Sequence, residues 1–161
     1  MISLKKRNLN NKGFTIVELL IVIVVIGILA LLVITTYSGI QAKARNSKRA
    51  SDVKSLQTQI EAYFSQNGFY PSRTDLNTAS WISTNMKSLD QNALIDPSNP
   101  TQSKTLVGAP PVAKSYSYAV TQSDGSTSCE SDDTGCAKYT LTATYEGTLN
   151  GSGTAVAQNL D

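Results

Sequence analysis

Residues 12–20, KGFTIVELL, open an apolar run that continues almost unbroken to Ile34. The residues before the run, 1–13, are mostly polar and basic. From Phe14 to Ile34 an α-helix would be about 31 Å long at about 1.5 Å per residue, which matches the thickness of a bilayer core. The stretch therefore predicts a membrane-spanning helix near the start of the sequence.

The order of the first segments differs from that of a secretory signal, in which the apolar core precedes the cleavage site. Here the polar leader and Gly13 come first, so a cut after Gly13 leaves the apolar segment on the mature chain. Positive charges hold a leader on the cytoplasmic side of a membrane, and this leader carries four, on Lys5, Lys6, Arg7 and Lys12. We therefore expect a single-pass protein of the cytoplasmic membrane whose C-terminal part crosses outward.

Two residues of the apolar run, Glu18 and Gly27, do not suit a helix that stands alone in a membrane. A carboxylate costs about 2.5–3.5 kcal/mol at the bilayer centre and less near its edge. Gly27 lowers helix propensity by about 1 kcal/mol, yet it lets another helix approach closely. Both suit a helix that packs against copies of itself, where Glu18 meets a cation. The nearest candidate is the α-amino group that cleavage after Gly13 creates on Phe14.

The segment KGFTIVELLIVIVVIGILA, residues 12–30, resembles the N-terminus of type IV pilins and of the related pseudopilins of type II secretion. The likeness lies in the order of a basic leader, Gly, Phe, Thr, one Glu and an aliphatic run that contains a Gly. It implies that a membrane prepilin peptidase cuts between Gly13 and Phe14 and N-methylates Phe14. It also implies that Glu18 neutralises the terminal amine of a neighbouring subunit during assembly.

The chain departs from the family in one respect, because it has no Pro shortly after the apolar run. Residues 34–37 read ITTY, and the first Pro of the chain is Pro71. β-Branched Thr lowers helix propensity slightly but does not break a helix as Pro does. We therefore expect the helix to continue without the family's kink.

The helix is predicted to extend through an amphipathic segment, residues 37–67. Its apolar residues recur every three or four positions and form one helical face, made of Val53, Leu56, Ile60, Tyr63 and Phe64. Asn67-Gly68 and then Pro71 end the helix. The whole helix, 14–67, thus has an apolar part, 14–36, that spans the membrane or fills a filament core.

Basic residues precede the amphipathic face, and two interpretations of them stay open. They form a solvated helix surface, or they contact acidic lipid head groups or neighbouring subunits just beyond the membrane. The residues are Lys43, Arg45, Lys48 and Arg49.

Residues 68–161 hold all five prolines and predict a small globular domain. Apolar residues between Asp75 and Leu94 predict one or two short helices, and DPSNP at 96–100 predicts a turn. Alternation in 115–121 and 139–145 predicts two antiparallel strands, and 155–160 predicts a short edge strand. The predicted apolar faces of the two main strands carry Tyr116, Tyr118, Val120, Tyr139, Leu141, Ala143 and Tyr145.

These segments together predict an α+β fold. A long N-terminal helix carries a small antiparallel sheet, whose apolar side packs on Val53, Leu56, Ile60 and Tyr63. The expected divisions are a cleaved leader, 1–13, the long helix, 14–67, and an extracellular sheet domain, 68–161. This is the lollipop layout that the resemblance to pilins implies.

Cys129 and Cys136 predict a structural disulfide, because export places them where a disulfide persists. Closing so short a loop stabilises the fold by about 2–3 kcal/mol on the chain-entropy model. The loop between them is acidic, and with Asp124 it holds Glu130, Asp132 and Asp133. Such carboxylates suit Ca²⁺, but their spacing is not that of an EF-hand, so a solvated loop is favoured over a metal site.

Composition excludes several classes of function. The chain has no His, which rules out a His-based triad or a His-ligated metal site. Its net charge is +2, and the leader carries four positive charges, so residues 14–161 have a net charge of −2 and give no case for nucleic-acid binding. No nucleophile and base stand in a recognisable pattern, so we expect neither an enzyme nor a cofactor.

The sequence therefore predicts a structural subunit of a type IV pilus that supports adhesion or twitching motility. The alternative is a pseudopilin of a type II secretion or DNA-uptake system. The expected partners are other copies of the chain, the prepilin peptidase, the pilus assembly machinery and, before assembly, membrane lipid. The protein is expected in the cytoplasmic membrane first and in an extracellular filament afterwards.

Overall fold

The structure is a computed structural model that describes residues 13–129 and 133–160. The chain divides into two compact units, Met1–Ile40 and Gln41–Asp161. Helix α1, Ile16–Asn67, contributes residues to both units. The other elements all lie in the second unit: α2 (Arg73–Leu76), α3 (Ala79–Asn85), the 3-10 helix η1 (Gln91–Leu94), β1 (Tyr116–Gln122), β2 (Cys136–Leu149) and β3 (Ser152–Gln158).

Helix α1 is 52 residues long and is not interrupted at the two threonines that follow the apolar run. It ends at Asn67, where the sequence predicts its end. Gly68 has a φ of +81°, a left-handed conformation that suits glycine, and its N–H donates to the carbonyl oxygen of Phe64 over 2.7 Å. The side-chain amide of Asn67 donates to the carbonyl of Tyr63 over 2.9 Å and satisfies another end group.

Three short helical segments follow α1, where the sequence predicts one or two. The first, α2, begins directly after Pro71 with a capping box. The Asp75 N–H donates to Ser72 Oγ over 3.1 Å, and the Ser72 N–H donates to Asp75 Oδ2 over 3.0 Å. Ser72 is therefore the N-cap of α2, which starts one residue later.

The sheet is an antiparallel meander in the order β1-β2-β3. Tyr118 pairs with Leu141, and Leu141 pairs with Ala157 on its other side. The predicted edge strand is confirmed, although it begins at Ser152 and not at residue 155. The middle strand β2 is longer than predicted, because it starts at Cys136 and continues to Leu149.

The longer β2 is irregular near its end. Its pairing with β3 passes from Thr144↔Thr154 directly to Leu149↔Ser152, so residues 145–148 bulge out of the ladder. Gly147 has a φ of +73° in this bulge. Bulges redirect side chains, and this one turns Glu146 toward α1, as the next section describes.

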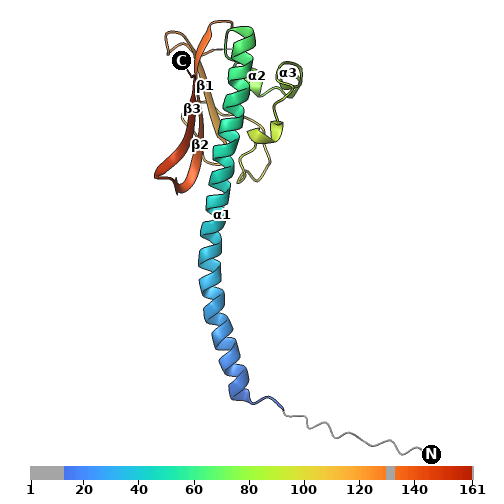
Figure 1. Cartoon of the computed structure of the whole chain (residues 1–161), viewed down its shortest axis with the longest axis vertical. Coiled ribbons are helices and arrows are strands. Elements are labelled where there is room, and N and C mark those ends of the chain that lie inside the picture. The colour runs from blue at the N-terminus through green and yellow to red at the C-terminus, as the bar shows by residue number, and fades with distance from the viewer. Residues whose placement is uncertain (1–12, 130–132, 161) are drawn as a thin grey trace, which may run out of the picture. The chain divides into compact units, whose positions relative to one another are not determined.

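The core of the second unit lies between its sheet and the Gln41–Asn67 part of α1. Figure 1 shows the sheet on one side of that helix and α2 and α3 on the other. The predicted helical face is buried except for Phe64, and the predicted apolar faces of β1 and β2 are buried except for Tyr145; Phe64 and Tyr145 are half-buried. The α+β fold with an antiparallel sheet is confirmed. The helix and sheet residues of the core are Val53, Leu56, Ile60, Tyr63, Tyr116, Tyr118, Val120, Tyr139, Leu141 and Ala143.

Candidate functional site

The first functional segment is the start of α1, where Thr15 and Glu18 form a capping box. Thr15 donates to Glu18 Oε2 twice, from its N–H over 2.8 Å and from its hydroxyl over 2.6 Å. The Glu18 N–H donates back to Thr15 Oγ1 over 3.2 Å. Glu18 therefore closes the first turn of its own helix, where a carboxylate also interacts well with the helix dipole.

This role of Thr15 was missed in the sequence reasoning, which treated Glu18 as an isolated carboxylate that needs a partner from another chain. The signal was present, because Thr15-x-x-Glu18 before an apolar run is the pattern of a capping box. The cap gives Glu18 a local reason to be where it is. It leaves the proposed pairing with a neighbouring amine as a second role for the same carboxylate.

The large side chains in the apolar part of α1 are not buried by other residues of their unit. The large apolar side chains from Phe14 to Ile34 are between 47% and 86% exposed. In the described part of the chain, α1 is long and apolar enough to cross a membrane. Gly27 has no heavy atom beyond its own helix backbone within 4 Å of where a Cβ would be, so this position is open to a second helix. So large an apolar surface requires lipid or other protein.

Of the four basic residues beyond the apolar run, Arg49 is not on a solvated surface. Its side chain is only 1% exposed and binds Asp96 in a two-pronged ion pair, Nε to Oδ2 at 2.7 Å and Nη2 to Oδ1 at 2.9 Å. Asp96 is also 1% exposed. The first of the two interpretations is therefore wrong for Arg49, whose charge holds the globular part against α1. The turn predicted at 96–100 supplies the partner.

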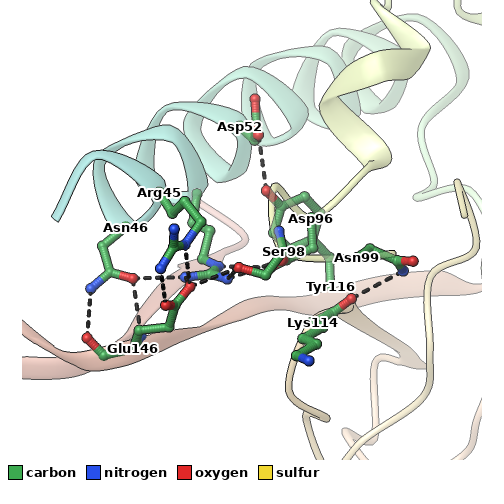
Figure 2. A network of polar contacts seen from close by, with 10 residues as sticks. Arg45, Asn46, Asp52, Asp96, Ser98, Asn99, Lys114, Tyr116 and Glu146 are labelled. Atoms are coloured by element: carbon green, nitrogen blue, oxygen red, sulfur yellow. Dashed lines mark hydrogen bonds and ion pairs between the residues drawn. The ribbon is translucent and has the colours of Figure 1, made fainter. Parts of the chain in front are cut away.

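Glu146, turned toward α1 by the β2 bulge, joins Arg45 to the same network (Figure 2). Arg45 Nε donates to Glu146 Oε1 over 2.7 Å, and Arg49 Nη1 lies 3.0 Å from the same oxygen. Ser98 donates its hydroxyl to Glu146 Oε1 over 2.7 Å. One carboxylate thus connects α1, the 96–98 loop and β2.

Asn46 fixes the backbone of that bulge, as Figure 2 also shows. Its amide donates to the carbonyl oxygen of Glu146, and its Oδ1 accepts the Glu146 N–H, both over 3.0 Å. Its Oδ1 also accepts from Arg49 Nη1 over 2.8 Å. Asn46 is only 1% exposed. Its side-chain amide pairs with both backbone groups of Glu146, as the backbone of a neighbouring strand would.

The electrostatics of the network favour its charged form. The hydrogen bond from Arg45 has the largest effect on the pKa of Glu146. Desolvation opposes it, the bonds from Ser98 and Arg49 add to it, and the pKa is lowered to about 2. The hydrogen bond to Asp96 raises the pKa of Arg49 above its ordinary value, and the bond to Glu146 does the same for Arg45. Arg45, Arg49 and Glu146 are therefore charged across the physiological range.

The two remaining basic residues, Lys48 and Lys43, lie in different surroundings. Lys48 forms an ion pair with Asp52 one helical turn later. The other oxygen of Asp52 accepts from the hydroxyl of the buried Tyr116 over 2.9 Å, which links α1 to β1. Lys43 is exposed and stays open to either of the two interpretations.

A second polar contact, which is partly buried, lies near the end of α1. Glu61 accepts from the hydroxyl of Tyr139 over 2.9 Å and from that of Tyr70 over 3.1 Å. The two tyrosine rings meet edge to face with centroids 4.7 Å apart. Burial, and next the hydrogen bond to Glu61, raise the pKa of Tyr139 well above its ordinary value. These contacts join the end of α1 to β2 and to Tyr70.

The predicted cysteine pair is joined. A disulfide links Cys129 to Cys136, with Cα atoms 5.9 Å apart. Glu130 and Asp132, two of the four carboxylates weighed for Ca²⁺, lie outside the described residues. Within the ranges 13–129 and 133–160 no three His, Cys, Asp or Glu side chains are grouped to hold a metal ion.

Comparison with known proteins bears on the N-terminal segment. The family model described as the prokaryotic N-terminal methylation motif matches residues 8–34. The matched range contains the Gly13-Phe14 bond, the Thr15–Glu18 cap and the open position at Gly27.

The proteins that this chain resembles include a core protein of type II secretion and a type IV major pilin. The chain is 40% identical over 60 residues to "Type II secretion system core protein G" of Dickeya chrysanthemi, which is 37% of this chain and 39% of that protein. It is 38% identical over 63 residues to "Type IV major pilin protein PilA" of Myxococcus xanthus, 39% of this chain and 29% of that protein. The matches thus span about two fifths or less of these relatives. No solved structure matched the chain.

Proposed function

We propose that this chain is a structural subunit of a type IV pilus, assembled by packing of its apolar helices after a prepilin peptidase removes residues 1–13. The observation that carries the proposal is the combination at the start of α1. A methylation motif lies on a membrane-length apolar surface that is uncovered within its unit, and one carboxylate sits at its head. A monomeric anchor explains the length of the apolar run and, through the Thr15 cap, the carboxylate, but it does not explain the open position at Gly27.

The proposed roles of the site residues follow from that arrangement. Cleavage falls between Gly13 and Phe14, and the new amine of Phe14 is methylated and positively charged. One Glu18 oxygen, Oε2, accepts the bonds from Thr15, so within residues 13–129 and 133–160 the other oxygen, Oε1, has no recorded hydrogen-bond donor. In a filament, we propose, Oε1 takes the Phe14 amine of a neighbouring copy. Gly27 gives the close approach between helices.

The proposed partners and location follow as well. Before assembly the apolar part, 14–36, lies in lipid of the cytoplasmic membrane, and the sheet domain, 68–161, lies outside it. The prepilin peptidase and the pilus assembly machinery act on the chain there. After assembly the other copies replace the lipid, and the filament carries the sheet domains outside the cell, where it serves adhesion or twitching motility.

The test is to shear surface appendages from the source cell and to analyse their major component by mass spectrometry. The proposal expects this chain, beginning at Phe14 with one added methyl group. Glu18→Gln, which keeps the shape and removes the charge, is expected to insert and to be cleaved but to enter filaments poorly. Lys54→Gln, also a charge removal at an exposed position of α1 but outside the apolar run and the basic stretch, is the matched control and is expected to assemble normally. Sheared filaments that lack this chain would overturn the proposal.

A pseudopilin of a type II secretion or DNA-uptake system is the second candidate, favoured by the names of several relatives. A pseudopilin has the same N-terminal chemistry but forms a short filament within the envelope. The same shearing experiment separates the two roles. Processed Phe14-methylated chain that stays with the cell envelope, together with a secretion or uptake defect on deletion of the gene, would favour the pseudopilin.

A further inference from the structure

The β2–β3 turn contains a modification pattern that the proposed function does not use. Residues 150–152 read Asn-Gly-Ser, which is the Asn-x-Ser/Thr acceptor pattern for N-linked glycans. The chain has eleven asparagines, and Asn150 is the only one in this pattern with a residue other than Pro in the middle. Asn99-Pro100-Thr101 has the outer residues but carries the excluded Pro. The chain thus offers one acceptor and one internal control.

The fold places Asn150 at the apex of a hairpin, as an acceptor requires. Leu149 pairs with Ser152, so Asn150 and Gly151 alone make the turn. Their φ angles, +53° and +83°, are both left-handed, as in the type I′ turns that connect twisted strands. Both residues are exposed. The amide side chain therefore stands at the outermost point of the sheet.

The surroundings of the turn leave room for a bulky group. Cβ atoms built on Gly147, Gly151 and Gly153 would each have no non-neighbouring heavy atom within 4 Å. In the described part of the chain the Asn150 amide has no hydrogen bond that a modification would break. A substituent on its nitrogen would therefore extend into solvent without displacing any packed side chain.

The hairpin also presents an edge that a glycan would protect. β3 is the last strand of the meander, so within the described sheet its outer backbone groups are not paired with another strand. Val156 of β3 is 52% exposed. An open edge strand favours pairing with other chains, and proteins cover such edges by several means. A hydrophilic glycan beside the edge is one such cover.

We propose that Asn150 is an N-glycosylation site of the exported domain. The donor class is an oligosaccharide linked through phosphate to a membrane polyprenol, used by a membrane transferase. The Asn150 amide nitrogen attacks the anomeric carbon of the sugar, a C–N bond forms, and the C–O bond to phosphate breaks. The polyprenyl phosphate leaves with the electron pair of that bond, and the amide proton passes to a base of the transferase. The proposal rests on the export that the proposed function includes.

The test uses the full chain isolated from the source cell. Trypsin cuts after Lys138 and leaves residues 139–161 as one peptide, since they contain no Lys or Arg. This peptide holds two asparagines, Asn150 and Asn159. Electron-transfer fragmentation is expected to place hexose or hexosamine masses on Asn150, with Asn159 bare. The peptide that contains Asn99 is expected to be unmodified.

Variants distinguish an N-linked glycan from sugars on the nearby threonines. Asn150→Gln and Ser152→Ala are each expected to remove the added mass completely, and Ser152→Thr is expected to keep it, because only the last retains the acceptor pattern. A native peptide without added mass, or a mass that persists in Ser152→Ala, would overturn the site. Processed chain found in filaments without the glycan would leave the proposed function intact.

Discussion

Arg49 of α1 and Asp96 of the loop before β1 form a buried two-pronged ion pair between residues 47 positions apart, each with a side chain only 1% exposed. Taking both charges out of water is costly, and their geometry and further hydrogen bonds offset that cost. Loss of one partner leaves a buried charge without compensation. The pair therefore makes the attachment of the globular part to α1 specific.

Arg49→Met is expected to destabilise the second unit by about 3–5 kcal/mol, because it leaves Asp96 charged and buried. Arg49→Met combined with Asp96→Leu is expected to recover much of the loss, since neither charge remains. The measurement is denaturant unfolding of the full chain in detergent, followed by the fluorescence of its single tryptophan, Trp81.

Lys43→Met is the control for that experiment, because Lys43 is exposed on the same helix. Its effect is expected to stay within about 0.5 kcal/mol. An Arg49→Met variant no less stable than Lys43→Met would show that the ion pair is not what fixes the globular part to α1.

Glu146 predicts a dependence of stability on acid. Its pKa is lowered from 4.5 to about 2 in the folded protein, chiefly by the hydrogen bond from Arg45. A group whose pKa is lower in the folded than in the unfolded state stabilises the fold. This stabilisation is complete at a pH above the unfolded-state pKa, and it is lost as the pH falls toward the folded-state pKa. The denaturant concentration at the midpoint of unfolding is therefore expected to decrease as the pH is lowered from 4.5 to about 2. In Glu146→Gln this part of the fall should be reduced, and parallel curves for the two proteins would contradict the assignment.

Much of the fold could be predicted from the sequence, because the signals were local. The apolar run marked the first part of α1, the spacing of Val53, Leu56 and Ile60 marked its buried face, and Asn67-Gly68 marked its end. Alternation in β1 and β2 gave the faces of both strands. The lengths of β2 and β3 were less well predicted, because their ends depend on pairing across a bulge and not on composition.

The polar network could not be predicted in the same way. Arg49 and Asp96 are far apart in sequence, and an Arg on a polar helix face resembles a solvated residue until its partner is known. Glu146 reaches the network only because the bulge in β2 turns it toward α1. The Thr15–Glu18 cap is different, because the Thr-x-x-Glu spacing before an apolar run is a local signal that identifies a capping box from the sequence alone.

Removal of the disulfide is expected to destabilise the second unit by about 2–3 kcal/mol, the loop-closure value for so short a loop. The double variant Cys129→Ser/Cys136→Ser avoids a free thiol, and the same tryptophan-monitored unfolding measures the effect. Reduction of the native chain should give the same loss as the double variant. No change under either treatment would mean that the bond adds nothing to the stability of the fold.

Thr15→Ala is expected to fray the first turn of α1, because it removes the hydroxyl that Glu18 uses for the cap. Loss of such a cap costs about 0.5–2 kcal/mol. The measurement is amide hydrogen exchange of residues 16–19 in detergent micelles, which should become faster. Thr15→Ser should restore slow exchange.

The matched control for the cap is Thr36→Ala. The Thr36 hydroxyl donates to the carbonyl of Leu32 over 2.9 Å within the same helix, but it caps nothing. Exchange at residues 16–19 should be unchanged in this variant. Equal exchange in Thr15→Ala and wild type would show that the first turn does not depend on the capping box.

The central claim is that a carboxylate at the head of an apolar helix is compensated by the amine of another copy. A reconstruction of assembled filaments, at a resolution that shows side chains, tests it most directly. The account predicts a Glu18 carboxylate oxygen within about 4 Å of the Phe14 amine nitrogen of a neighbouring subunit, the range of an ion pair. A filament in which Glu18 contacts only its own Thr15, with no amine from another subunit beside it, would contradict the account.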